Sequence, residues 1–450
     1  MSADHGPGAD RAGVAKDAER GTSPGGDRLA YDEALAAVLR DVPALQGEVV
    51  ALTDAFGRAL AAPVVSPVAL PPWDNSGMDG YAVRREDIVG ASPDAPVRLR
   101  VCGMIAAGAD PLALPTVLPG CAHRIMTGAP VPPGSDAVIG IEDTDRGTTS
   151  VTIHSGRDTA GRGNIRPRGE DVAAGETLFE RGTTLGASHL GVLSSVGSAQ
   201  VRVHRRPRVV LLSGGDELVM LDRFDEAQAG RRIVSSSSYA LPAYLRELGA
   251  DVTVRPLVPD TLASMTDALL AALDSEPDLL ITTGGVSVGD HDYTRDALQQ
   301  LGGNIEFWRA RIRPGGPIGR GTLRGTHWLG LPGNPVSTMV TALLFAAPLV
   351  RQLGGHARVH HLLLRARMLD IAATPSALAH FLRVSLRTGA DGMLEAKLAG
   401  AQGSNLLRTM ASADALLVVP EHAIVTEAGA IYEVLLLPGA LWQTISTPTE

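Results

Sequence analysis

Three glycine-rich turns, each directly after an apolar run, constrain the fold of this chain more than any other feature. They are 213–217 (SGGDE), 283–290 (TGGVSVGD) and 331–335 (LPGNP). The preceding runs have the composition of buried strands, and the last two turns lead into segments with helical spacing. We therefore expect all three turns to open on one edge of a parallel sheet, which is where α/β proteins bind ligands.

The chemistry of these turns indicates a phosphorylated ligand. Gly284 and Gly285 let backbone amides approach a phosphate closely. The turns also carry carboxylates suited to a hard cation such as magnesium: Asp216, Glu217, Asp290 and Asp292. A single glycine turn is equally consistent with a plain link between strand and helix, so the binding hypothesis depends on the three turns occurring together.

Composition limits the classes of protein that remain. A chain of 450 residues is too long for one core and suggests about three domains. The net charge of -9 argues against a broad nucleic-acid surface, and no uninterrupted apolar run is long enough to cross a membrane. Only two cysteines are present, Cys102 and Cys121, and they lack metal-type spacing. We therefore expect neither a disulfide framework nor a cysteine zinc site, and we expect a cytoplasmic location.

The first half of the chain predicts a linker domain interrupted by an insertion. Residues 1–28 have the composition of a disordered tail without a signal peptide. Helical spacing at 30–42, continuing through 49–60 and returning at 169–203 with Ser188 as a cap, predicts a helical linker domain formed by 29–66 and 159–205. Short alternating runs broken by Pro and Gly predict an inserted β-rich module at 67–158.

The second half predicts an α/β domain followed by a barrel. Strand and helix patterns alternate through 206–353, as in a parallel sheet with right-handed crossovers, and Asn334-Pro335 signals the start of a helix at 336–349. Short strands across 354–450 predict a small β-barrel. The expected fold class is thus α/β plus β, multidomain, with a parallel-sheet binding domain, an inserted β-rich module, a linker domain and a C-terminal barrel.

Four further places carry candidate functional groups, each with a plainer alternative. Asp79 lies in the turn-rich stretch 71–82, which is otherwise a solvated loop. Thr127 beside Gly128 binds either a ligand or its own turn, and Asp171 is either functional or a helix-start acid. Groups suited to an oxyanion, if they converge rather than remain surface charges, are Arg311, Arg313, Arg383 and Ser404.

Taken together, these motifs resemble the molybdopterin molybdenumtransferases, the molybdenum insertases that include the insertase domain of gephyrin. The resemblance extends from about residue 31 to 437. Its markers, specific through their order and spacing, are 74–76 with 78–82 (DNS, MDGYA), 126–134 (MTGAPVPPG), 169–171 (GED), 215–218 (GDEL), 284–293 and 331–335.

This resemblance implies a homodimer of elongated four-domain subunits, with each active site between the α/β domain of one subunit and the β module of the other. The implied reaction places molybdate on the dithiolene of adenylylated molybdopterin, with magnesium-assisted release of AMP. A molybdopterin adenylyltransferase is then the expected upstream partner, and no nucleic-acid or membrane partner is expected.

The resemblance also implies site residues, position by position. The catalytic set is Asp79, Thr127, Asp171, Glu217, Asp260 and Asp292, of which Glu217, Asp260 and Asp292 would hold magnesium. The set that binds adenylylated molybdopterin is Ser213, Gly215, Gly284, Gly285, Ser287, Gly289, Pro332, Gly333, Asn334 and Pro335. The molybdate set is Arg313, Pro317, Ser337, Arg383 and Ser404.

Three positions depart from the family pattern. Gly316 stands where the second lysine of Lys-Pro-Gly-Lys-Pro is usual, Gly214 replaces a threonine, and Ser237 replaces an asparagine. The missing cation leaves open a non-catalytic pterin-binding or scaffold relative, unless Arg311 compensates. A third alternative is an enzyme that shares only the α/β domain, such as a molybdopterin adenylyltransferase or a competence-damage-type nucleotide hydrolase. The 74–82 loop argues against this alternative because those relatives lack it.

Overall fold

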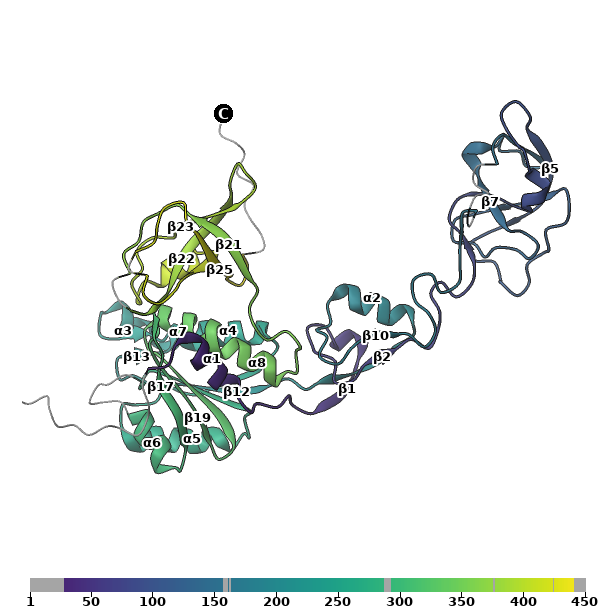
Figure 1. Ribbon diagram of the computed structural model, residues 1–450. Helices are drawn as coiled ribbons and strands as arrows, with labels where there is room; N and C mark the ends of the chain where they lie inside the picture. Colours follow the sequence, from purple (N-terminus) through teal and green to yellow (C-terminus); the bar gives the residue numbers. More distant parts are fainter. Residues whose placement is uncertain are drawn as a thin grey trace, which may run out of the picture. The chain divides into compact units, whose positions relative to one another are not determined.

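The computed structural model describes residues 28–156, 161, 163–286, 293–374, 377–423 and 425–440. The chain divides into two compact units, drawn in Figure 1. The first comprises the described parts of Met1–Leu45, Arg206–Gly354 and Arg358–Glu450, and the second comprises Gln46–Arg205 with Gly355–Ala357.

A six-stranded sheet forms the centre of the first unit, in the order β15-β12-β16-β20-β19-β17. Its strands are β12 (Arg208–Ser213), β15 (Asp251–Val254), β16 (Leu279–Thr283), β17 (Asn304–Arg309), β19 (Pro317–Leu323) and β20 (Thr326–Leu331). The first four strands in that order are parallel, as predicted, whereas β19 is antiparallel to both of its neighbours. The α/β prediction is confirmed, with a mixed edge that the sequence pattern did not reveal.

Helices cover both faces of this sheet because successive strand residues point to opposite sides. Val209 and Leu211 belong to a core shared with α1 (Tyr31–Leu39), α4 (Ser237–Glu247), α7 (Pro335–Thr341) and α8 (Ala347–Leu353). Val210 and Leu212 belong to a second core with α5 (Leu262–Leu273) and α6 (Tyr293–Gln300). Burial on both faces explains the continuous apolar runs in the strands.

The three glycine-rich turns leave the sheet at one level. Ser213 pairs with Thr283, and Thr283 pairs with Leu331, so the carboxyl ends of β12, β16 and β20 lie in register. The prediction that all three turns open on one edge is confirmed.

The helix after the third turn runs farther than predicted. A π-helical segment, Ala342–Ala346, joins α7 to α8, and the continuous helix Pro335–Leu353 is the one helix among the described residues that has the length and apolarity to cross a membrane. Most of it is buried in the core of the first unit, which accounts for its composition.

The C-terminal strands close into a barrel, as predicted. The strands are β21 (Leu363–Met368), β22 (Ala379–Thr388), β23 (Leu394–Leu398), β24 (Ala415–Val419) and β25 (Ile431–Leu436). Their order is β22-β23-β21-β25-β24, and β24 pairs back to β22 to close the ring. The short strand β18 (Ile312–Arg313) adds to β22 in parallel, so the Arg313 loop is hydrogen-bonded to the barrel.

Part of the second unit differs from the helical prediction. The segment predicted to continue a helix at 49–60 begins instead with β1 (Gly47–Ala51), which pairs with β11 (Gln200–His204). Of the segment 169–203, only α2 (Ala187–Ser195) is helical, and its N-cap is Gly186 rather than Ser188. Strand pairing across more than 140 residues overrode a local helical spacing, which a short window cannot anticipate.

The β-rich module predicted at 67–158 contains a five-stranded sheet in the order β7-β4-β6-β5-β8. The strands are β4 (Gly80–Val83), β5 (Val97–Ile105), β6 (Cys121–Ile125), β7 (Ala137–Gly140) and β8 (Ser150–Ile153). Two further strand pairs of the second unit involve residues outside 67–158. They are β2 (Val64–Val65) with β10 (Thr177–Phe179), and β3 (Asn75–Ser76) with β9 (Ile165–Arg166).

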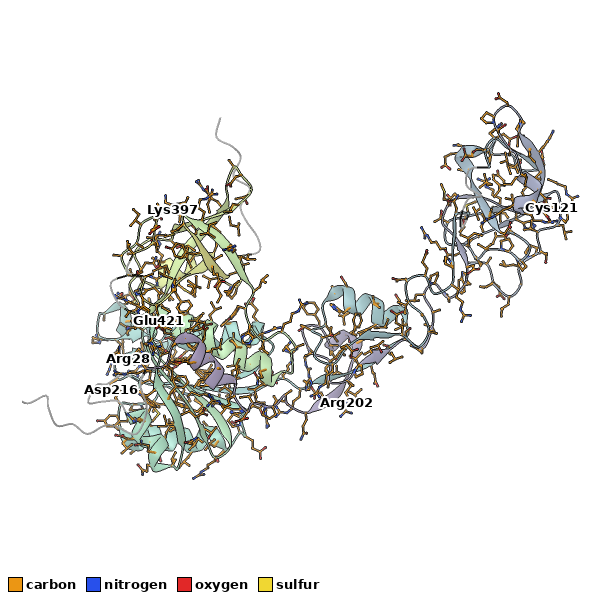
Figure 2. All side chains as sticks on the ribbon, viewed as in Figure 1. Arg28, Cys121, Arg202, Asp216, Lys397 and Glu421 are labelled. Atoms are coloured by element: carbon orange, nitrogen blue, oxygen red, sulfur yellow. A yellow bond between two sulfur atoms is a disulfide. The ribbon has the colours of Figure 1, made fainter. Side chains whose placement is uncertain are left out.

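The sequence analysis expected no disulfide framework and did not predict that Cys102 is bonded to Cys121 in this module (Figure 2 labels Cys121). Strands β5 and β6 are parallel neighbours, and a register shift between Val101 and Gly103 leaves Cys102 beside the start of β6. The two Cα atoms are 5.9 Å apart, within the usual range for a disulfide. Sequence separation alone did not reveal this pairing.

Candidate functional site

The three glycine-rich turns surround a cavity of about 390 Å³ at the carboxyl edge of the sheet. Among its lining residues are members of every turn: Gly214, Gly215, Gly284, Gly285, Gly333, Asn334 and Pro335. Gly284 has a φ of +79°, and a Cβ there would meet the carbonyl oxygen of Gly214 at 3.0 Å. The cavity therefore owes its shape to backbone that only glycine adopts without strain.

Two acidic side chains, Glu217 and Asp260, line the same cavity. Asp260 is held by its neighbour, since the Asp216 amide donates to Asp260 Oδ2 at 3.1 Å and the Asp260 amide donates to Asp216 Oδ1 at 3.1 Å. No group of three or more His, Cys, Asp or Glu side chains is placed to hold a metal ion among the described residues. Two carboxylates beside a phosphate-sized cavity still fit magnesium, which usually takes one or two carboxylates together with substrate phosphates.

Ser213 does not line this cavity. It is 1% exposed and belongs to a buried hydroxyl network below the turns. Thr283 Oγ1 donates to Ser213 Oγ at 3.0 Å, Ser238 Oγ donates to the same atom at 3.2 Å, and Ser235 Oγ lies 2.7 Å from Ser238 Oγ. The network links β12, β16 and the start of α4, so Ser213 supports the turns from beneath.

The remaining predicted binding residues divide into two groups. Pro332 is bonded to helix α7, because Thr338 Oγ1 donates to its carbonyl at 2.6 Å. The predicted positions Ser287, Gly289 and Asp292 lie outside the described residues, as does Asp290.

A second cavity, of about 660 Å³, lies between the Arg313 loop, the start of α7 and the barrel loop 402–405. Four of the five predicted molybdate residues line it: Arg313, Pro317, Ser337 and Ser404. Asn334 lines both cavities, so the two meet at the start of α7.

The fifth predicted molybdate residue, Arg383, is fully buried behind the barrel loop. Its Nε donates to Thr409 Oγ1 at 2.8 Å, and its Nη2 donates to the carbonyls of Ala401 and Gly403 at 2.9 and 3.1 Å. Its Nη1 has no hydrogen-bond partner among the described residues, which leaves one buried donor for a ligand or water.

Two more arginines, Arg28 and Arg309, line the second cavity and were not predicted. Arg309 lies four residues before Arg313 in the same basic stretch, a signal that the sequence did carry. Arg28 had no such signal, since it marks the end of the segment expected to be a disordered tail. The other predicted cation, Arg311, does not line the cavity, because its Nε donates to Glu421 Oε2 at 3.0 Å.

The remaining predicted residues belong to the second unit. Asp79 Oδ1 accepts hydrogen bonds from the backbone amide and the hydroxyl of Thr127, both at 2.7 Å. These bonds, the backbone one first, lower the pKa of Asp79 below its usual value. Asp171 lies on an exposed turn, where its amide donates to the carbonyl of Leu70 at 3.0 Å. The structure thus pairs Asp79 with Thr127, a contact that the sequence analysis did not predict.

Comparison with known proteins covers nearly the whole described chain. Residues 29–197 match the MoeA N-terminal region (domain I and II), 210–352 match a probable molybdopterin binding domain, and 365–437 match the MoeA C-terminal region (domain IV).

Individual relatives agree with these matches. Molybdopterin molybdenumtransferase 2 of Mycobacterium tuberculosis is 39% identical over 86% of this chain and 94% of its own length. Molybdopterin molybdenumtransferase of Nostoc is 37% identical over 87% of this chain and 89% of its own. The crystal structure of the molybdopterin biosynthesis moeA protein from Pyrococcus horikoshii superposes with a TM-score of 0.78 at 26% identity, covering 91% of this chain and all of that one. The chain is therefore an enzyme of the molybdopterin molybdenumtransferase family.

Proposed function

We propose that this enzyme inserts molybdate into adenylylated molybdopterin and releases AMP in a magnesium-dependent step of molybdenum cofactor biosynthesis. The main observation in support is that Asn334 lines both cavities, and that these two cavities differ in their chemistry. One has glycine turns and carboxylates, suited to a phosphate with its metal, and the other has arginines and hydroxyls, suited to a tetrahedral oxyanion.

The glycine cavity would hold the phosphates that join the pterin to AMP. Backbone amides near Gly284 and Gly285 approach the phosphate without a side chain in the way. Glu217 and Asp260 would hold magnesium, with Asp292 as a third proposed ligand. Bound magnesium would neutralise charge on the phosphoanhydride as water breaks it to release AMP.

The arginine cavity would hold molybdate beside the dithiolene. Arginine remains protonated at every physiological pH, so Arg313 binds a dianion without a change of protonation. The hydroxyls of Ser337 and Ser404 supply neutral donors, and Arg383 holds the barrel loop in place. Molybdate reaching the start of α7 would then adjoin the pterin bound in the first cavity.

By the same resemblance, we propose that the enzyme acts in the cytoplasm as a homodimer and receives its substrate from a molybdopterin adenylyltransferase. The Asp79–Thr127 pair and Asp171 would then come from the partner subunit to complete each site. The hydrogen bonds that Asp79 accepts from Thr127 support this role, because they hold its carboxylate ionised in one orientation.

A non-catalytic relative is the second candidate, favoured by one observation, the glycine at position 316 in the oxyanion cavity. A turnover assay decides between the enzyme and the non-catalytic relative. Purified protein given adenylylated molybdopterin, magnesium and molybdate should release AMP, measured by chromatography, and yield molybdenum-loaded cofactor, measured by metal analysis. Substrate binding without AMP would support the non-catalytic candidate, and ATP consumption with molybdopterin would support an adenylyltransferase.

A further inference from the structure

The oxyanion cavity is the second cavity, between the Arg313 loop, the start of α7 and the barrel loop 402–405. It has a glycine at position 316, where a lysine is expected, and its lining includes Arg28 from a distant segment of the chain. Gly316, where the resemblance leads us to expect lysine, lines this cavity together with Arg28, Arg309 and Arg313. No Asp or Glu is among the described residues that line it, and none of these three arginines forms an ion pair within the described chain. Three arginines without an ion pair among the described residues therefore line a cavity whose described lining has no carboxylate.

Backbone hydrogen bonds between Leu29 and the segment 309–311 hold Arg28 beside this cavity. The Leu29 amide donates to the Arg309 carbonyl at 3.2 Å, and the Arg311 amide donates to the Leu29 carbonyl at 2.7 Å. Leu29 packs on the core of the first unit. Neighbouring residues of an extended segment point to opposite sides, so the packing of the partly buried Leu29 on that core is consistent with the exposure of Arg28.

An ion pair adds a second restraint on Arg28. Arg311 Nη1 donates to the Arg28 carbonyl at 2.6 Å, while its Nε donates to Glu421 Oε2 at 3.0 Å. Arg28 and Glu421 are both labelled in Figure 2. Arg311 is therefore not the replacement for the missing lysine, because its guanidinium anchors the segment that carries Arg28.

We propose that Arg28 supplies the oxyanion-binding cation that Gly316 lacks, with Arg311 and Glu421 as positioning residues. The proposal rests on the function proposed above, in which this cavity takes molybdate. A charged hydrogen bond contributes enough to change affinity by about one to two orders of magnitude. Removal of Arg28 should therefore raise KM for molybdate by about ten-fold or more, with kcat at saturating molybdate largely retained.

The experiment compares Arg28→Ala, Arg28→Lys and a control, Arg40→Ala, which removes an exposed arginine after α1 that lines neither cavity. Molybdate binding is measured by equilibrium dialysis, and AMP release is measured against molybdate concentration. We expect weaker binding and a higher KM only in Arg28→Ala, with Arg28→Lys close to wild type.

A restored lysine provides the decisive variant. Gly316→Lys in the Arg28→Ala background should recover most of the molybdate affinity. A Cβ at position 316 would lie 3.2 Å from the Ile312 carbonyl oxygen, so Gly316→Ala in the same background controls for a local backbone shift.

Two failures are distinguishable. Wild-type affinity and KM in Arg28→Ala, with AMP still released, would overturn the role of Arg28 and leave the proposed function standing. No AMP release by the wild-type enzyme would refute the proposed function itself, and absence of molybdate binding by the wild type would overturn both.

Discussion

Gly284→Ala tests whether the backbone of the second glycine turn, rather than its side chains, creates the phosphate cavity. Two costs follow from the structure. A left-handed conformation costs an alanine about 1–2 kcal/mol, and Gly284 has a φ of +79°. The new Cβ would also lie 3.0 Å from the Gly214 carbonyl oxygen, so the first and second turns must separate by a few tenths of an ångström.

Gly302→Ala is a matched control. Gly302 has a φ of +78° after helix α6, and a Cβ there meets nothing within 4 Å. The Gly302→Ala variant therefore has the same conformational cost, but it does not displace the turns that line the cavity. Urea unfolding followed by tryptophan fluorescence is sensitive to the first unit, because Trp308 and Trp328 stack there with centroids 5.5 Å apart; Trp73 adds a signal from the second unit, so the two transitions are fitted separately.

Both variants should lose about 1–2 kcal/mol of unfolding free energy, with a somewhat larger loss for Gly284→Ala. Only Gly284→Ala should bind adenylylated molybdopterin more weakly, by about ten-fold or more, because the displaced turn loses an amide hydrogen bond to phosphate. Titration calorimetry measures this affinity. Equal affinity in the two variants would refute the proposal that this turn holds the phosphate.

The remaining predictions concern three local interactions. Thr127→Val should raise the pKa of Asp79 only part of the way towards 3.8, because the backbone hydrogen bond, which lowers this pKa most, remains. An NMR titration of the carboxyl group measures the pKa, and an unchanged value would contradict the prediction. Since the folded-state pKa of Asp79 is lowered, its contribution to stability is present above its usual pKa and is lost as pH falls below it. Ser213→Ala should lower the free energy of unfolding by about 1–3 kcal/mol, because the buried hydroxyls of Thr283 and Ser238 lose a hydrogen-bond partner. Urea unfolding measures this change, and an unchanged stability would contradict the role of the hydroxyl network in supporting the turns. Cys102→Ser should destabilise the second unit by about 3 kcal/mol, as expected for opening a loop of 19 residues, with no effect on molybdate affinity; a calorimetric scan with an unshifted transition would contradict it.

Local signals predicted much of the α/β domain and the barrel. Strands and helices alternate through 206–353 as expected, and Asn334-Pro335 marks the start of α7 as expected. Such signals succeed because side-chain periodicity and turn chemistry act over a few residues. They failed at β1 and β11, where partners lie more than 140 residues apart and local spacing favoured helix.

Within the candidate site, the motifs identified which residues belong together, and the structure decided which of them face a cavity. Glu217, Asp260 and Gly284 line the cavity at the sheet edge, while Ser213 lies beneath it. Arg383 is buried behind the oxyanion cavity rather than exposed in it. A motif records residue type and order, but burial depends on what packs from elsewhere in the chain.

The sequence by itself determined the alternation of strands, glycine turns and helices, and hence the chemistry offered along one sheet edge, because these depend on neighbouring residues. Only the tertiary structure decided that Arg28 lines the same cavity as Arg313, that Arg311 pairs with Glu421, and that Cys102 meets Cys121. The first two contacts join residues more than 100 positions apart, and the third depends on a register shift between parallel strands. Contacts of this kind arise only when the packed fold brings the segments together.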